Sequence, residues 1–441
     1  MHVAERFARF AIDYRAQPLS PEVLHHAKRA VIDWHAALLP GAVVPPATLL
    51  EEAFDDELNT GKATLALGRR ATTRVAALIN GAAAHTVEVD DIFRDGIYHP
   101  GAATIAAALA VGQANDVGGA AFLRAVVVGY EISTRIGAVM GRAHYKYWHN
   151  TGTIGTFGAA AAAAEILQLD QGRFAHALCT AATFAAGLQQ AFRMDSMSKP
   201  LHAGHAAEAG VTAALAAARG VTGSLDVLEG EAGFGRAMGG DPDWEKALAT
   251  LGTDFHVTRM TFKNHACCGH TFAAIDGALE LQKKMKLAAA DIERVKVATY
   301  RAGLEVAHYE EPQTPAEGRF SLRYVVATAL THGSVRLAAF EDARLRDPAT
   351  RALMKKISLA VDPELDASFP GQRAARVAIE DKKGRREEFL QPTRKGDPDQ
   401  PLTDRELDAK FLELASPVLG AAPAQKLLDR LWRLEAASSL A

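Results

Sequence analysis

Two histidines and four carboxylates lie close together in the segment INGAAAHTVEVDDIFRDGIYHPG, and they are His85, Glu88, Asp90, Asp91, Asp95 and His99. A carboxylate next to an imidazole can orient the ring and bias it toward the role of general base or general acid. The pattern predicts proton transfer in this segment. A solvated acidic turn followed by a capping histidine is the alternative that the segment leaves open.

Lys199 lies near the start of a helix that we predict over residues 196–220. Ser198 is the expected cap, and Pro200 fits the first turn. Pro200 should also keep Lys199 out of the helical conformation and so fix the direction of its side chain. Because the positive end of the helix dipole disfavours an ammonium and favours a bound anion, we expect a lowered pKa for Lys199 beside an anion pocket. An exposed lysine in a loop is the alternative interpretation.

Three further segments hold candidate residues. His149 precedes a glycine-spaced helix start in HNTGTIGTFG, where the backbone could approach an anion. Lys263 and Cys268 lie in FKNHACCGHTFAAID, and Tyr324 follows Arg323 in FSLRYVVATAL. Each of these residues, taken alone, is explained as readily by packing.

The histidines and cysteines lack the spacing of a zinc site. Cys267 and Cys268 are adjacent, and the chain has no Cys-x-x-Cys. His202 and His205 share a helix face three residues apart. The glycine-rich GEAGFGRAMGG has the spacing of neither a dinucleotide fingerprint nor a phosphate loop. We predict no metal and no cofactor.

The composition excludes several classes of protein. The 49 basic and 52 acidic residues are spread through the 441-residue chain, which leaves no polybasic track for nucleic acid or a membrane surface. Three cysteines cannot form a disulfide framework, and the apolar stretches are shorter than the roughly 18 residues of a membrane span. We expect a soluble cytoplasmic protein whose partner is a small molecule.

Helical periodicity predicts a large all-helical domain over residues 1–260. One helix begins at Ser20 and Pro21, and others are expected over residues 73–86, 102–113, 120–139, 155–167 and 171–188. Their alanine and glycine faces allow close packing.

A smaller α+β domain is predicted over residues 261–396. Its signals are a helix over residues 272–286, strand patterns at 294–300, 373–379 and 387–390, and a hairpin turn at 381–384. A polar linker is expected at 391–401. Helices in residues 397–441 should return to the first domain, so the fold class is mainly α with an inserted α+β lid.

Taken in order, these segments resemble the MmgE/PrpD family, which includes 2-methylcitrate dehydratase, cis-aconitate decarboxylase and iminodisuccinate epimerase. The resemblance is carried by NGAAAHTVEVDD followed by HPG, HNTGTIGTFGAAAAAAEILQLD, SKPLHAGHAAEAG, VLEGEAGFG, FKNHACCGHTFAAIDGA and FSLRYVVATAL. It implies a helical domain with an inserted lid, an active site between them, a homodimer, and no metal or organic cofactor. The pocket residues that it implies are Asp90, Asp91, His99, His149, Lys199, Lys263 and Tyr324.

The sequence departs from the family's pattern at three positions. Glu88 stands where decarboxylase-like members have an aspartate, and Ile92 replaces the threonine after the Asp-Asp pair. Cys268 stands where those members have a histidine in the lid loop. These departures weigh against cis-aconitate decarboxylase itself and leave methylcitrate an open question as substrate.

The residues and the resemblance together predict a lyase of the dehydratase type that removes a proton next to a carboxylate of a small di- or tricarboxylate. His149 or His99 would be the base, and its partner or Tyr324 the acid. Lysines would bind carboxylates, and the expected substrate contacts are Lys199, Lys263, Asp90, Asp91 and Cys268. Reprotonation on the other face would instead give an epimerase. A non-catalytic carboxylate-binding protein and a metal-dependent hydrolase are further alternatives.

Overall fold

The computed structural model describes residues 1–192, 196–369 and 371–440, and its contacts divide the chain into two units. Unit 1 comprises Met1–Thr261 and Thr403–Ala441, and unit 2 comprises Phe262–Leu402. The sequence predicts domain limits after residues 260 and 396, and these limits stay a prediction. Each unit is described below by itself.

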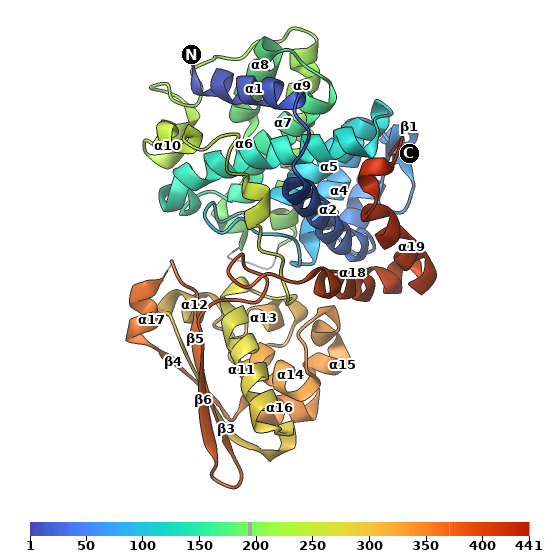
Figure 1. Ribbon diagram of the computed structural model, residues 1–441. Helices are drawn as coiled ribbons and strands as arrows, with labels where there is room; N and C mark the ends of the chain where they lie inside the picture. Colours follow the sequence, from blue (N-terminus) through green and yellow to red (C-terminus); the bar gives the residue numbers. More distant parts are fainter. Residues whose placement is uncertain (193–195, 370, 441) are drawn as a thin grey trace. The chain divides into compact units, whose positions relative to one another are not determined.

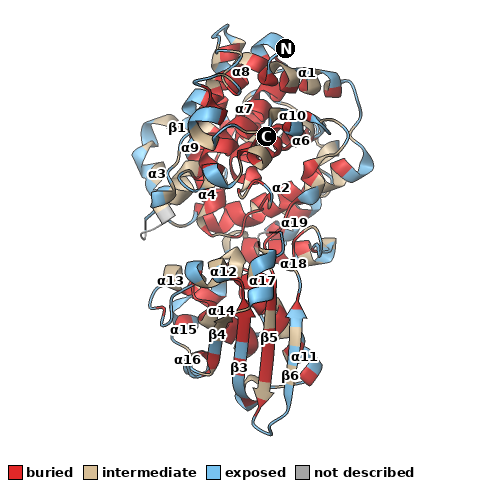
Figure 2. Ribbon diagram, turned by 90° about the vertical axis from the view of Figure 1, so that its left-hand side faces the viewer, coloured by how far each residue is buried: buried red, intermediate tan, exposed pale blue. Residues whose placement is uncertain are grey.

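Unit 1 is mainly helical and is organised around α7, which spans Asn150–Ile166 (Figure 1). Every residue of α7 is buried, because α5, α6, α8 and α9 pack around it (Figure 2). The other helices are α1 Val3–Arg15, α2 Pro21–Ala42, α3 Ala47–Ala53, α4 Thr73–Thr86, α5 Pro100–Ala114, α6 Gly119–Tyr145, α8 Gln171–Phe184, α9 Ser198–Ala218, α10 Trp244–Leu248, α18 Asp404–Leu419 and α19 Ala421–Leu431.

Small residues on the facing helices make this packing possible. A Cβ atom at Gly158 of α7 would lie 2.3 Å from Oγ1 of Thr104 in α5. A Cβ atom at Gly210 of α9 would lie 2.5 Å from the Cβ of Ala159. Neither distance is compatible with van der Waals contact, so the glycines allow the helices to approach closely. The predicted alanine and glycine faces are confirmed.

Local sequence signals predicted the positions of most helices closely. The hydroxyl of Ser20 accepts a hydrogen bond from the backbone N–H of Val23, so α2 begins at Pro21 as predicted. Helix α4 has the bounds predicted for residues 73–86. Helix α6 is longer than predicted and contains a break at Gly141, whose φ of 61° is not helical.

A two-stranded ribbon interrupts the helices of unit 1, so the prediction of an all-helical domain is wrong in this detail. Strand β1, Leu58–Thr64, pairs antiparallel with β2, Arg70–Ala71. The segment LNTGKAT has no clear alternation and contains Gly61 at φ 70°, so its pattern does not indicate a strand. Gln113 of α5 holds the ribbon by accepting the Thr64 N–H at 2.9 Å.

Unit 2 contains a four-stranded sheet with the strand order β4-β3-β5-β6. Strand β3, Ile292–Thr299, pairs parallel with β4, Ile357–Val361, and antiparallel with β5, Ala375–Asp381, which pairs antiparallel with β6, Arg386–Gln391. The register places Val295 opposite Ile357 and Ile379, and Val377 opposite Phe389. Strands β3, β5 and β6 lie where they were predicted. Strand β4 was missed because it is short and only partly buried.

Helices accompany the sheet of unit 2. Helix α11, Phe272–Met285, packs on β5 and β6 and against α14, Leu322–His332 (Figure 1). The remaining helices are α12 Arg301–Val306, α13 Pro315–Arg319, α15 Asp342–Leu345, α16 Pro348–Met354 and α17 Pro363–Ser368.

The segment predicted as a linker, residues 391–401, is a packed loop of unit 2. Arg394 and Asp397 are buried there and form two hydrogen bonds, of 2.9 and 2.7 Å. The carbonyl of Gly396 accepts the N–H of Phe262 at 3.0 Å. Polar composition suggested a solvated linker, but these charged side chains satisfy one another and so can be buried.

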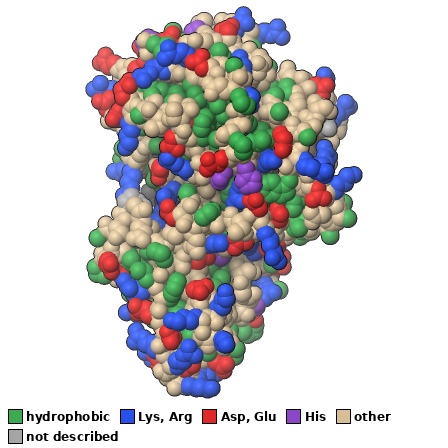
Figure 3. Space-filling view, in the orientation of Figure 1, with side chains coloured by type: hydrophobic (Ala, Val, Ile, Leu, Met, Phe, Trp, Pro, Cys, Tyr) green, Lys and Arg blue, Asp and Glu red, His purple; other side chains and the backbone are tan. Residues whose placement is uncertain are grey.

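Charged side chains of both signs are interspersed on the molecular face shown in Figure 3, in keeping with the absence of a polybasic track in the sequence. Within residues 1–192, 196–369 and 371–440, no helix combines the length and the apolar character that crossing a membrane requires.

Candidate active site

The acidic loop, residues 87–99, connects α4 to α5 and carries several of the predicted residues. It begins with Glu88 in the left-handed region at φ 62°, and His99 is the residue that precedes α5. The N–H of His99 donates to Oγ1 of Thr151 in α7 at 3.3 Å. The carbonyl of Val89 accepts a hydrogen bond of 2.7 Å from the buried ammonium of Lys410 in α18. The returning C-terminal helices therefore help to hold the loop.

His85 and His99 both face Asp90. Nδ1 of His85 lies 2.7 Å from Oδ2 of Asp90, and Nδ1 of His99 lies 3.2 Å from the same oxygen. Burial alone would raise the pKa of Asp90, but the charges and hydrogen bonds of the two rings bring that pKa well below its usual value. Asp90 is therefore an ionised carboxylate in a buried position, and it stabilises positive charge on the adjacent imidazoles.

Asp91 has a different environment from its neighbour. Oδ2 accepts a hydrogen bond of 2.7 Å from the hydroxyl of Tyr130, and Oδ1 accepts the N–H of Gly101 at 3.0 Å. Burial, followed by the charge of Asp33, raises the pKa of Asp91 to about 8. Both oxygens are occupied, so the geometry favours a role in fixing the start of α5 over the substrate contact predicted from the sequence.

His149 directly precedes α7 and is almost fully buried. Its N–H donates to the carbonyl of Gly187 at 2.9 Å, and its Nδ1 lies 3.0 Å from Nδ1 of His202 in α9. The ring is stacked on that of His85, with 5.4 Å between the centroids.

The pKa of His149 lies well below its ordinary value, chiefly because the ring is buried. The neighbouring groups whose positive charge lowers it further are His85, Lys199, His202 and His99. Burial likewise lowers the pKa of His202 to about 4. Both rings are therefore neutral at neutral pH, which is the state that a general base requires.

Lys199 forms an ion pair with Glu88, and both side chains are 18% exposed. Two local predictions about this segment are wrong. Met197, not Ser198, precedes the helix, and Lys199 is its second residue in spite of Pro200. Proline restricts the preceding residue without forbidding the helical conformation, and in the first turn its missing N–H costs no hydrogen bond. Gly220 follows the helix in the left-handed region, at φ 96°.

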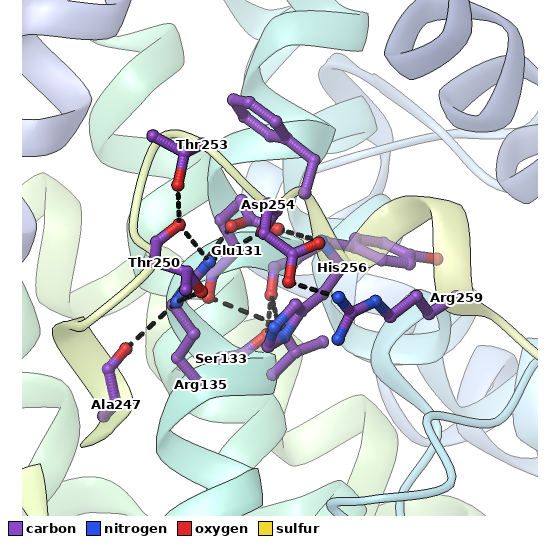
Figure 4. A network of polar contacts seen from close by, with 12 residues as sticks. Glu131, Ser133, Arg135, Ala247, Thr250, Thr253, Asp254, His256 and Arg259 are labelled. Carbon is purple, nitrogen blue, oxygen red and sulfur yellow. Dashed lines mark hydrogen bonds and ion pairs between the residues drawn. The ribbon is translucent and has the colours of Figure 1, made fainter.

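A buried polar network joins α6 to the segment that contains Thr250, Asp254 and His256 (Figure 4). Glu131 of α6 accepts hydrogen bonds from Nε of Arg135, at 3.1 Å, and from the N–H of His256. The guanidinium of Arg135 also donates to the carbonyls of Thr250 and Asp254, at 2.9 and 2.7 Å. Burial raises the pKa of Glu131 to about 7, against the charge of Arg135.

This network holds residues 247–261, which end the first of the two stretches of chain that form unit 1. His256 stacks on Phe93 of the acidic loop, with ring centroids 5.2 Å apart. Thr261 and Ile92 exchange two backbone hydrogen bonds, of 2.8 and 2.9 Å. The position of the acidic loop thus depends on Glu131 and Arg135, neither of which is in the loop.

The other predicted residues belong to unit 2. Lys263 is buried, and its charge acts on the thiol of Cys267. Cys268 is half-buried, and its N–H donates to the carbonyl of Arg319 at 3.0 Å. Tyr324 is buried beside Phe340 and donates its hydroxyl to the carbonyl of Ala339. Their assignment to the site stays a prediction.

Among the described residues, the donor atoms of His85, Asp90 and His99 lie within 4.8 Å of one another, a spacing at which side chains can hold a metal ion. Both rings face one and the same oxygen, at hydrogen-bonding distance. A tetrahedral site instead needs donors that approach from separate directions at about 2.0–2.2 Å from the ion. The arrangement is that of a hydrogen-bonded triad, so we assign no ligands here.

Two residues of the site, His202 and His85, received too little weight in the interpretation of the sequence. His202 was considered only as a partner of His205, yet it lies three residues after Lys199 and therefore on the same face of α9. His85 is the last residue but one of α4, and its ring faces Asp90 of the loop that follows. Helical spacing would have pointed to His202, whereas the fold of the loop after α4 had no comparable signal.

Known proteins resemble this chain over its whole length. The family model described as the MmgE/PrpD N-terminal domain matches residues 5–247, and that of the MmgE/PrpD C-terminal domain matches residues 265–434. The cis-aconitate decarboxylase-like protein oryM of Aspergillus oryzae is 28% identical, with 100% of this chain and 96% of that protein aligned.

Two other relatives complete the comparison. The cis-aconitate decarboxylase of Homo sapiens is 26% identical over 98% of this chain and 92% of its own length. The 2-methylcitrate dehydratase of Salmonella typhimurium is 34% identical, but over 25% of this chain and 24% of its own length.

Proposed function

Because the chain belongs to the MmgE/PrpD family, we propose that it is a lyase that acts on a small tricarboxylate and needs no cofactor. The relatives named above as decarboxylases and dehydratases are named for the tricarboxylates cis-aconitate and 2-methylcitrate. Removal or delivery of a proton at a carbon next to a carboxylate requires an acid, a base and cations, all of which protein side chains can supply.

The observation that carries the proposal is a cluster of four imidazoles, two of which face the buried carboxylate of Asp90, with a lysine nearby. The ring of His85 lies 4.7 Å from that of His99 and 5.4 Å from that of His149, between centroids. Lys199 is close enough for its charge to act on His149. A neutral imidazole can act as a base, and an imidazole beside the ionised carboxylate of Asp90 can act as an acid, so the cluster can supply both in one place.

His149 is the base in this proposal. Its neutral ring is present at neutral pH, and the negative charge of an entering tricarboxylate raises the proton affinity of His149 at the moment when a proton must be taken up. The C–H bond next to a carboxylate breaks, the proton moves to His149, and the electron pair remains on the substrate.

His99 is the acid, because the ionised carboxylate of Asp90 stabilises its charged ring. In a dehydration, the C–O bond breaks as His99 delivers its proton to the departing hydroxide, which leaves as water. Lys199 holds a substrate carboxylate, for which it exchanges its ion pair with Glu88.

Dehydration is the reaction that we propose first, and decarboxylation is the second candidate. Similarity over the whole chain to proteins named cis-aconitate decarboxylase favours the second. Glu88, Ile92 and Cys268, which depart from the decarboxylase pattern, weigh against cis-aconitate itself as the substrate. In a decarboxylation the C–C bond to the departing CO₂ breaks, and the acid delivers a proton to carbon.

Product analysis separates these reactions. Purified, chelator-treated protein is incubated with 2-methylcitrate, citrate and cis-aconitate, and the products are followed by carbon NMR together with the release of CO₂. We expect water loss from a hydroxylated tricarboxylate, with no product from His149→Asn. Inversion at one carbon without loss of water or CO₂ would identify an epimerase, and binding of all three compounds without turnover would contradict the proposal.

A homodimer is part of the same proposal. Light scattering of the purified protein should give a mass twice that of the chain.

A further inference from the structure

The side chain of His202 is built into the site through His149. The two Nδ1 atoms lie 3.0 Å apart, and the ring centroids are separated by 5.2 Å. A hydrogen bond between two ring nitrogens requires that one carries the proton and the other accepts it. The pair therefore has two possible arrangements. They differ in which ring nitrogen of His149 can take a proton from the substrate.

Two glycines make room for this ring pair. A Cβ atom at Gly187, where φ is 129°, would lie 3.2 Å from both Cγ and Nδ1 of His202. A Cβ atom at Gly152 would lie 2.3 Å from the carbonyl oxygen of Ala186 and 3.1 Å from the Cβ of His202. The carbonyl of Gly187 in turn accepts the backbone N–H of His149. The same turn thus holds His149 by its backbone and leaves space for His202.

The protonated state of the base decides between the two arrangements. Once His149 has taken a proton, both of its ring nitrogens carry hydrogen, so Nδ1 can only donate. Nδ1 of His202 lies at hydrogen-bonding distance to accept, provided that its own ring is neutral. Burial keeps the pKa of His202 near 4, so this condition holds at neutral pH.

We infer that His202 is a positioning residue whose Nδ1 accepts the Nδ1–H of His149, which leaves Nε2 of His149 as the nitrogen that takes the substrate's proton. The inference rests on the proposed function, in which His149 is the base. His202 does not touch the reacting carbon in this account. It sets the tautomer of His149 and stabilises the imidazolium that forms.

The charged and titratable groups around the pair come from three segments. Those that act on His149 are His85 of α4, His99 before α5, and Lys199 and His202 of α9. Those that act on His202 are His85, Lys199 and His205. The charge of each of these groups opposes a positive charge on the pair, as burial does, so a hydrogen bond accepted by His202 acts against them.

The tautomer can be observed without any substrate. Nitrogen NMR of protein labelled with ¹⁵N in its histidines, assigned with the variants His149→Asn and His202→Asn, shows which ring nitrogens carry hydrogen. The inference predicts a proton on Nδ1 of His149 and none on Nδ1 of His202. The opposite assignment, with the proton on Nδ1 of His202, would overturn it whether or not the substrate is known.

Activity provides the second test. Leucine at position 202 removes the acceptor, whereas asparagine can present its amide oxygen near the place of Nδ1. His202→Leu should lower kcat by about 10- to 100-fold, the range expected for a hydrogen bond to a charged group, with KM nearly unchanged. The acid limb of the pH profile of kcat/KM should move to lower pH, because His149 then binds a proton less readily.

Two further variants separate positioning from folding. His202→Asn should restore kcat to within a few-fold of the wild type, and His205→Asn, on the exposed side of the same helix, should leave all parameters unchanged. Equal losses in the leucine and asparagine variants, with unmoved pH profiles, would contradict the inference. If the wild type turns over no tricarboxylate, the proposed function fails, while the NMR assignment still decides the role of His202.

Discussion

Lys199 and Glu88 form an ion pair that joins the first turn of α9 to the loop after α4. The anion beside this lysine is thus a side chain of the protein itself. Both side chains are largely, but not fully, buried, so a substrate carboxylate can reach the ammonium and replace Glu88. If Lys199 binds a substrate carboxylate, as we propose, the strength of this internal pair affects how tightly the substrate is held.

Changes at the two ends of this pair should have opposite effects. Lys199→Met should raise KM by about 10- to 100-fold, because a charged hydrogen bond to the substrate is lost. Glu88→Gln should lower KM, because the substrate no longer competes with a carboxylate. The measurement is initial-rate kinetics. The control is Arg74→Met, which breaks the exposed pair of Arg74 in α4 with Glu208 in α9. An unchanged KM in Lys199→Met would show that Lys199 does not bind the substrate.

Asp90 and Asp91 are neighbours in the sequence but should respond differently to the same substitution. Asp90→Asn should lower kcat by about 10²- to 10⁴-fold, because an amide cannot stabilise the charged ring of His99. Asp91→Asn serves as the matched control and should retain most of the activity, since its oxygens contact Tyr130 and Gly101. Steady-state kinetics of both variants decides the point, and equal losses would mean that Asp91 is a direct participant.

The buried carboxyl of Asp91 should also affect stability through pH. Its pKa of about 8 in the folded protein lies above the ordinary value, so between about pH 4 and pH 8 the folded state binds more protons than the unfolded state. This group therefore makes the free energy of unfolding fall as the pH rises through that window. Urea titrations of Asp91→Asn and the wild type at pH 5 and pH 8.5 compare their free energies of unfolding. Relative to the wild type, the free energy of unfolding of the variant should be higher at pH 8.5 than at pH 5. A constant difference between the two proteins would show that Asp91 is ionised throughout.

Arg135 should contribute more to stability than another arginine of the same network. Its guanidinium is buried against Glu131, so Arg135→Met should lower the free energy of unfolding by about 3–5 kcal/mol. Arg259 pairs with Asp254 at the surface, so Arg259→Met should change it by less than about 1 kcal/mol. Urea denaturation of both variants compares the two values. A small effect of Arg135→Met would mean that the segment 247–261 is held by other contacts.

Much of the fold was available from the sequence because its signals are local. Ser20 with Pro21 set the start of α2, and the strand pattern of β5 and β6 around the turn at Gly384 predicted their hairpin. The ordered motifs also indicated the family, which the two domain matches confirm. Strand β4 was missed because it is short and only partly buried, and the β1–β2 ribbon was missed because β1 has no clear alternation.

The site was predicted less completely than the fold. His99, His149 and Lys199 are brought together in unit 1, as the motifs suggested. The role of Asp91 depends on which atoms face it in the folded chain, and no spacing in the sequence contains that information. Helical spacing places His202 on the same face of α9 as Lys199, but it does not reveal the contact with His149. The same holds for Glu131, whose influence on the acidic loop passes through His256 and Thr261.

The central claim is that His149 moves a proton at a carbon next to a carboxylate, and exchange with deuterated water tests it most directly. Proton NMR of the chelator-treated protein with a panel of substituted tricarboxylates should show deuterium entering that carbon in the wild type, and no exchange in His149→Asn. Binding of the panel, seen as line broadening, without any exchange in the wild type would contradict the claim and indicate a carboxylate-binding protein instead.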